Sequence, residues 1–192
     1  AGLYWLLASV TAGYGLSYYR GSIIVAGDAA ATAANIVALD FDYRVAIFGI
    51  LLGQVALFFF GLAVYRLFRD VDRPLARVFL AAMLVSVTIA VVNVFNHFGA
   101  IHVMSGAEYL QAFTTEQRQA TAMSLLRMSN VGQGLLEIFW VPYYAAFGWL
   151  ALKSRRLPKY CGVMLVVMSV GFGTNLLNKF LFPTFHPAVF TQ

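Results

Sequence analysis

Long apolar runs alternate with short polar stretches along the whole chain, and five of these runs are long enough to form membrane-spanning helices. They cover residues 2–19, 43–65, 78–102, 128–152 and 161–182. A helix rises about 1.5 Å per residue, so roughly 20 apolar residues cross the hydrocarbon layer of a bilayer. The pattern therefore predicts an all-α membrane protein, a five-helix transmembrane bundle that forms a single domain over residues 1–192.

Two polar stretches between the runs predict shorter helices. Asp28 stands directly before an alanine-rich segment that ends near Leu39, and an acid there suits the N-cap of a helix. Roughly 11 residues are too few to span a bilayer, so we expect a short interfacial helix after the first span. Residues 105–127 contain capping-box patterns at Ser105 and Thr114. They predict a helical cap before the fourth span, with its second helix running into that span.

Composition excludes a soluble domain, because 61% of the residues are hydrophobic, 11% are charged and the mean hydropathy is +0.77. The formal charge of +5 does not indicate a nucleic-acid partner, because most basic residues lie in the short loops after the second and fourth spans. These are Arg66, Arg69, Arg73, Arg77, Lys153, Arg155, Arg156 and Lys159. Positive charge marks the cytoplasmic side of a membrane. We therefore expect the N-terminus inside and the C-terminus outside.

The single cysteine and the first residue settle two smaller questions. Cys161 has no second cysteine to pair with, which excludes an intramolecular disulfide. The chain opens on Ala1 inside an apolar run and without an initiator methionine, so we expect the natural N-terminus to lie upstream.

Glu137 is the only acidic residue within any of the five apolar runs. Asn130, Gln133 and Glu137 are spaced i, i+3 and i+7, so on a helix they share one face. A charge near the middle of a bilayer costs at least about 2.5 kcal/mol, so this face should point toward protein or a water-filled cavity. Pro142, a little further along, predicts a kink.

Residue counting places polar groups of three spans at similar depths. Asn93, Glu137 and Asn175 each lie 16 residues from a basic loop residue, which corresponds to about 24 Å. Four residues deeper, at about 30 Å, the same spans carry His97, Gln133 and Lys179. We therefore predict an outward-facing polar groove. Its ligand-binding candidates are Asn93, His97, Asn130, Gln133, Glu137, Asn175 and Lys179, with Arg44, His102 and Arg127 at the rim.

The same residues have a simpler interpretation, in which they only satisfy one another as hydrogen bonds between helices. A lone buried acid needs a cation or a proton, so Glu137 either pairs with Lys179 or serves a site. Metal binding is not expected, because His97 and His102 are five residues apart and no second metal-ligand motif accompanies them. No pattern indicates a cofactor or a nucleophilic catalyst.

Residues 23–36 read Ile-Ile-Val-Ala-Gly-Asp-Ala-Ala-Ala-Thr-Ala-Ala-Asn-Ile and are followed by Arg44 and a second span. Together with residues 105–113 and the basic loop at 156–159, this stretch resembles a bacterial membrane-protein family catalogued as domain of unknown function 4386. The resemblance extends over nearly the whole chain. It implies an integral protein of the bacterial inner membrane and supplies no activity. It draws attention to Asp28, which we add to the rim as a partner for Arg44 or Arg127.

Three classes of function remain open. The first is a non-enzymatic protein that holds a lipid or small amphiphile, or serves as an accessory subunit for a membrane protein partner. The second is a membrane-embedded enzyme that acts on a lipid head group, with Glu137 and His97 as acid–base candidates and Arg44 or Arg127 binding phosphate. The third is a small transporter, which the absence of a convincing internal repeat disfavours.

Overall fold

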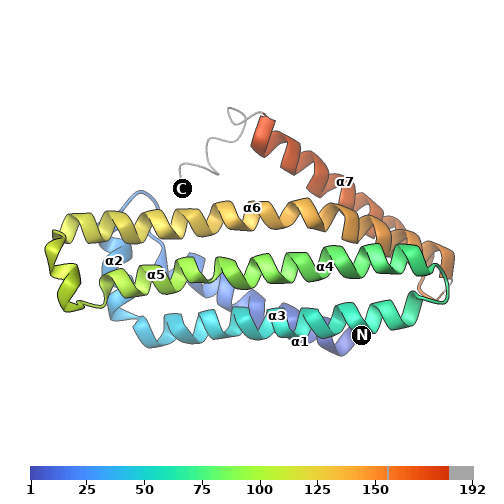
Figure 1. Ribbon diagram of the computed structural model, residues 1–192, viewed down its shortest axis with the longest axis horizontal. Helices are drawn as coiled ribbons and strands as arrows, with labels where there is room; N and C mark the ends of the chain where they lie inside the picture. The colour runs from blue at the N-terminus through green and yellow to red at the C-terminus, as the bar shows by residue number, and fades with distance from the viewer. Residues whose placement is uncertain (155, 182–192) are drawn as a thin grey trace.

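The computed structural model of the protein describes residues 1–154 and 156–181, and every regular element in this part of the chain is helical (Figure 1). The α-helices are α1 (Gly2–Tyr18), α2 (Ala29–Ala38), α3 (Asp40–Phe68), α4 (Arg73–Asn93), α5 (Phe95–Met104), α6 (Thr115–Ser154) and α7 (Lys159–Leu181). A π-helical turn, η1 (Tyr19–Ile23), follows α1, and a 3-10 turn, η2 (Glu108–Ala112), precedes α6. The expected all-α membrane bundle is confirmed.

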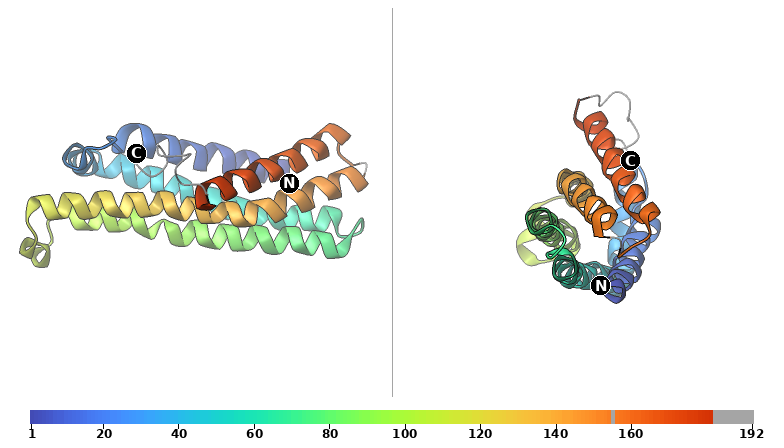
Figure 2. Two further views of the ribbon diagram at one scale, coloured as in Figure 1. Left: turned by 90° about the horizontal axis from the view of Figure 1, so that it is seen from above. Right: turned by 90° about the vertical axis from the view of Figure 1, so that its right-hand side faces the viewer.

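Four helical segments are long and apolar enough to cross a bilayer, namely α3, α4 with α5, α6, and α7. They contain the second to fifth predicted spans, except for residue 182, which lies outside the described residues. The first predicted span falls in α1, which has 17 residues and continues into η1. Length and composition therefore identify four spans in the described part of the chain, and α1 lies alongside α3 (Figure 2).

Small residues, among them Gly49 and Gly53 of α3, allow α1 and α3 to approach closely. A Cβ at Gly49 would lie 2.9 Å from the Thr11 carbonyl oxygen, and one at Gly53 would lie 2.6 Å from the Ala12 Cβ. At Gly15 a Cβ would overlap the backbone of α3. Van der Waals contact between backbones is the usual source of helix association in a membrane, and here it fixes α1 against the bundle.

The short helices follow the capping signals only in part. Asp28 accepts the backbone N–H of Ala31 at 2.8 Å and caps α2, as expected. Thr114 and Gln117 exchange two hydrogen bonds across the start of α6, which confirms the second capping box. The first box is absent, because Ser105 ends α5 and η2 starts after Ala107 without a side-chain cap.

The third predicted span is divided at Val94, where backbone bonds tighten to i to i−3 spacing between α4 and α5. In contrast, α6 remains one helix of 40 residues across Pro142. The Ser169 hydroxyl donates to the Val141 carbonyl oxygen at 2.8 Å and joins α7 to this part of α6. Helix α7 packs mainly against α6 and stands apart from the other helices (Figures 1 and 2).

Two apolar cores fill opposite ends of the bundle. One surrounds Tyr43, Ile47 and Leu126 near α2, and the other surrounds Phe68, Phe79 and Leu150. We call the end that holds residues 66–77, 153–154 and 156–159 the basic end, and the end that holds α2 and η2 the cap end. Their assignment to the two sides of the membrane stays a prediction.

Candidate functional site

The imidazole of His97 is enclosed between two hydroxyl groups inside the bundle. Its Nδ1 lies 2.7 Å from the Tyr43 hydroxyl on α3, and its Nε2 lies 2.9 Å from the Ser129 hydroxyl on α6. All three side chains are buried. A neutral imidazole has one N–H and one acceptor nitrogen. One hydroxyl therefore donates to the ring and the other accepts from it, which fills the hydrogen-bonding capacity of His97.

The π-helical turn η1 places a further aromatic ring against the same histidine. Tyr19 meets His97 edge-on, with ring centroids 4.5 Å apart. The Tyr19 hydroxyl donates to the Leu126 carbonyl oxygen on α6 across 3.4 Å. Because Tyr19 is also buried, α1 with η1, α3, α5 and α6 together seal the pocket that holds the imidazole.

Asn93 joins α4 to the same turn of α6. Its amide donates to the Ser129 carbonyl oxygen at 2.9 Å, and Asn96 donates to the Asn93 Oδ1 at 2.9 Å. This approach requires Gly132, because a Cβ at that position would overlap Asn93 Oδ1. We call Tyr43, Asn93, His97 and Ser129 the His97 cluster. Its members satisfy one another without a ligand.

A second polar group, the Glu137 cluster, lies where α7 crosses α6 and consists of Glu137, Asn175 and Lys179. Asn175 donates to Glu137 Oε2 at 2.7 Å, and Lys179 Nζ lies 3.6 Å from Oε1. The Glu137 and Lys179 side chains are 13% and 15% exposed, so the pair is accessible from the side. The lysine chain runs across Gly134, where a Cβ would lie 2.9 Å from Nζ. The ion pair considered from the sequence is therefore present.

The seven candidates do not line one groove. Ser129 and Gly132 direct the His97 cluster toward α4 and α5, whereas Gly134 and Glu137 face α7. The structure separates two groups that residue counting placed together, because depth along a helix does not specify direction around it. The remaining two candidates, Asn130 and Gln133, are half-buried and form no side-chain hydrogen bond with another described residue.

The four rim candidates are dispersed at the cap end. Arg44 pairs with Asp40 at 2.8 Å on the surface, and Asp28 is engaged in capping α2 rather than in pairing with an arginine. His102 bonds to the Tyr109 hydroxyl. Arg127 is exposed and lines a cavity of about 280 Å³ beside Gly27 and Ser124. These residues therefore form separate local contacts.

The two acid–base candidates, His97 and Glu137, contact different partners in the structure. Both ring nitrogens of His97 and both carboxylate oxygens of Glu137 are engaged by different partners, so the two are not paired as acid and base. Within residues 1–154 and 156–181, no three His, Cys, Asp or Glu side chains gather at one point.

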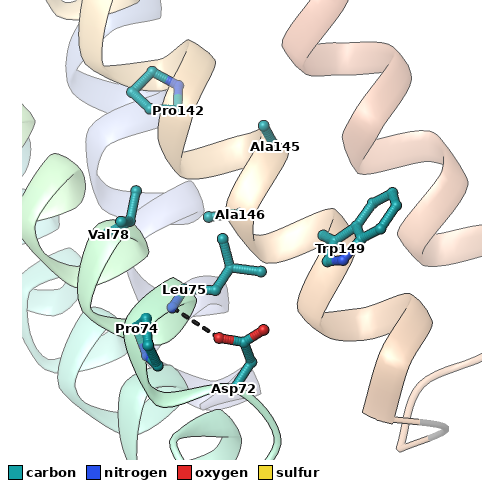
Figure 3. Close-up of a pocket in the computed structure, with 8 residues that line it drawn as sticks. All are labelled: Asp72, Pro74, Leu75, Val78, Pro142, Ala145, Ala146 and Trp149. Atoms are coloured by element: carbon teal, nitrogen blue, oxygen red, sulfur yellow. Dashed lines mark hydrogen bonds between the residues drawn. The ribbon is translucent and has the colours of Figure 1, made fainter.

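An apolar groove of about 670 Å³ lies between α4 and α6 (Figure 3). It is lined by Asp72, Pro74, Leu75, Val78, Pro142, Ala145, Ala146 and Trp149. Asp72 closes it at the basic end, where its carboxylate accepts the Leu75 N–H at 3.1 Å and binds Lys153 at 2.8 Å. The hydrogen bond from Lys153, followed by that from Leu75, holds the pKa of the Asp72 carboxyl below its usual range.

A smaller cavity of about 210 Å³ lies between α1, α3, α4 and α6. Aromatic side chains form much of its wall, including Trp5, Trp140 and Tyr144. The indole N–H of Trp140 donates to the Ser86 hydroxyl at 2.9 Å and joins α6 to α4 at this cavity.

The family model described as domain of unknown function (DUF4386) matches residues 1–191. The chain belongs to this family. The resemblance seen in residues 23–36 and 105–113 is thereby confirmed, and the DUF4386 description assigns no activity to any of the residues above. No curated protein and no solved structure matches the chain.

Sequence reasoning missed three members of the environment of His97 in this DUF4386 protein, namely Tyr19, Tyr43 and Ser129. Serine and tyrosine are common in membrane helices, so their presence alone gave no signal. One hint was available on α6. Ser129 and Gly132 are three residues apart and so share one face of the helix, and small residues on such a face let another helix approach.

Proposed function

We propose that this protein is a non-enzymatic membrane protein that holds a lipid or small amphiphile at the crossing of α6 and α7. The Glu137 cluster is the recognition element. It offers a carboxylate, an ammonium group and an amide to a zwitterionic or hydroxylated ligand, and the apolar surfaces of the two helices contact its hydrocarbon part.

The observation that carries this proposal is the partial exposure of an ion pair between two membrane-length helices. Charged side chains within membrane-spanning helices cost free energy and are commonly retained for function. The Nζ–Oε1 distance of 3.6 Å is long for a charge-assisted hydrogen bond, so the pair is loosely closed. Beyond it, α7 leaves open space, since a Cβ at Gly171 would meet no atom within 4 Å.

The His97 cluster supports the non-enzymatic part of the proposal. Its groups are buried and mutually bonded, with the hydroxyls of Tyr43 and Ser129 occupying both ring nitrogens. A general base must come within hydrogen-bond reach of its substrate. The enclosed imidazole offers no such approach, and the lipid-modifying class loses its proposed base.

Native mass spectrometry after gentle extraction from the source membrane tests the proposal. We expect the wild-type chain to retain a small molecule that Glu137→Gln loses while its unfolding midpoint in detergent changes little. Glu108→Gln is the matched control, because Glu108 is exposed on η2, and it should retain the molecule. A wild-type chain that carries no small molecule, or equal retention by Glu137→Gln, would contradict the proposal.

The exposure of α7 favours a second candidate, an accessory subunit. In the most apolar 18-residue window of α7, 11% of the residues are buried, against 39% in each of the other three spanning segments. A membrane helix of a partner protein would cover this surface. The same mass spectra distinguish the two candidates, because a partner adds the mass of a polypeptide.

A further inference from the structure

The groove between α4 and α6 has a volume of about 670 Å³ and a largely apolar lining. Its two ends differ, since Pro142 lies at one end and the Asp72–Lys153 ion pair at the other (Figure 3). Ala145 and Ala146 keep its floor low on α6, while Leu75 and Val78 form the wall on α4. Trp149 flanks it and is 54% exposed. Apart from Asp72, every lining side chain is apolar or aromatic.

The span from the groove to Lys153 is comparable with one leaflet. The groove is lined by α6 residues from Pro142 to Trp149, and Lys153, beyond this stretch, is 11 residues from Pro142, which is about 16 Å along the helix. Half of a hydrocarbon layer of about 30 Å is close to this length. An acyl chain whose head group lies at Lys153 would therefore extend about as far as Pro142. Tryptophan is enriched at the membrane–water interface, and Trp149 lies one turn from Lys153.

Charge at the mouth of the groove selects the head group. Residues 66–77, 153–154 and 156–159 contain seven basic and two acidic residues. Asp72 occupies one direction around Lys153 Nζ, at 2.8 Å. An ammonium group has three N–H donors, so Lys153 retains donors for a phosphate oxygen. The surrounding excess of positive charge adds attraction for an anionic lipid, as it does in other basic segments near membranes.

We propose that the groove between α4 and α6 binds one acyl chain of an anionic phospholipid from the leaflet at the basic end, with Lys153 contacting the lipid phosphate. The site is separate from the Glu137 cluster. It lies at the other side of Pro142 along α6, and it takes a lipid for its charge rather than for a hydroxyl or zwitterionic group.

The test uses the full chain reconstituted in vesicles of equal parts phosphatidylglycerol and phosphatidylcholine, followed by native mass spectrometry of the released protein. The wild type should retain phosphatidylglycerol in preference to phosphatidylcholine. Lys153→Gln should reduce this preference about fivefold, the factor expected for one cation near a membrane surface. Ala145→Phe fills the groove and should remove the retained lipid.

Two controls separate the groove from general effects. Ala81→Phe makes the same substitution at an exposed position on α4 outside the groove and should retain phosphatidylglycerol like the wild type. Trp149→Ala shortens the wall without adding bulk, so it should weaken retention even if Ala145→Phe folds poorly. Glu137→Gln should leave phosphatidylglycerol retention unchanged, which distinguishes this site from the one under Proposed function.

Three results would overturn the inference. Equal retention of the two lipids by the wild type would remove the role of charge. Unchanged retention in both Ala145→Phe and Trp149→Ala would place the bound lipid elsewhere. A preference that depends on Lys153 but survives both groove substitutions would indicate attraction by surface charge alone.

Discussion

The His97 and Glu137 clusters both join α6 to neighbouring helices through polar side chains, yet their surroundings differ. The His97 cluster is sealed among four helical segments, and Asn93, His97 and Ser129 are each less than 9% exposed. The Glu137 cluster joins only two helices and leaves its charged side chains 13% and 15% exposed. The first therefore resembles a packed core, whereas the second resembles a loosely closed contact.

This difference shows how two clusters of polar residues in one membrane protein can have different roles. Where every donor and acceptor is satisfied by a rigid neighbour, a polar cluster fixes helix positions and is costly to change. Where a long lysine side chain supplies the contact, its geometry adjusts at little cost. The two clusters should accordingly respond very differently to substitution.

The largest expected effect is that of His97→Ala. The change leaves a cavity and deprives the hydroxyls of Tyr43 and Ser129 of their shared partner. The free energy of unfolding should fall by about 3 kcal/mol, measured by thermal unfolding in detergent. His102→Ala is the control, because His102 is exposed, and its cost should stay within about 0.5 kcal/mol. Equal losses of unfolding free energy in the two variants would show that His97 stabilises the protein no more than an exposed histidine does.

Two neighbouring glycines of α6 provide a finer comparison. At Gly132 an added Cβ would overlap Asn93, whereas at Gly134 it would meet the end of the Lys179 side chain. Gly132→Ala should lower the free energy of unfolding by about 1 to 2 kcal/mol. Gly134→Ala should be neutral or slightly stabilising, because alanine favours a helix and the lysine can move. A larger loss of unfolding free energy in Gly134→Ala than in Gly132→Ala would contradict this comparison.

The smallest effect concerns the ion pair between Asp72 and Lys153 at the basic end. Lys153 lowers the pKa of the Asp72 carboxyl, so the folded state holds the carboxylate form more strongly than the unfolded state does. The resulting stability is present above the unfolded pKa of about 4 and is lost as pH falls through the lower folded pKa. The unfolding midpoint of the wild type should therefore exceed that of Asp72→Asn at pH 6, and the difference should shrink below pH 4. A constant difference across this range would contradict the assignment.

The sequence predicted those features that depend on local pattern. The cap of α2 by Asp28 and the capping box of Thr114 and Gln117 follow from residue type and spacing, and both are present. The pairing of Glu137 with Lys179 was one of two alternatives, and it follows from the cost of an isolated charge.

Features that depend on rotation around a helix axis could not be predicted in the same way. Residue counting gives depth, but it does not tell which neighbour a side chain meets. Asn93 and Glu137 were therefore assigned to one groove, although they face different helices. The break between α4 and α5 at Val94 could not be predicted, because no glycine or proline stands at this position. The groove above Ala145 arises from small side chains, which give no distinct signal.

The length of α6 has a mechanical consequence. Its 40 residues correspond to about 60 Å, twice the thickness of a hydrocarbon layer, so one continuous helix extends from the cap end to the basic end. A displacement of the cap end is therefore transmitted along α6 to the basic end. Proline removes one backbone hydrogen bond from a helix, so α6 bends most easily at Pro142. Pro142 lies between Glu137 and Lys153, and bending there tilts the two ends of α6 against each other.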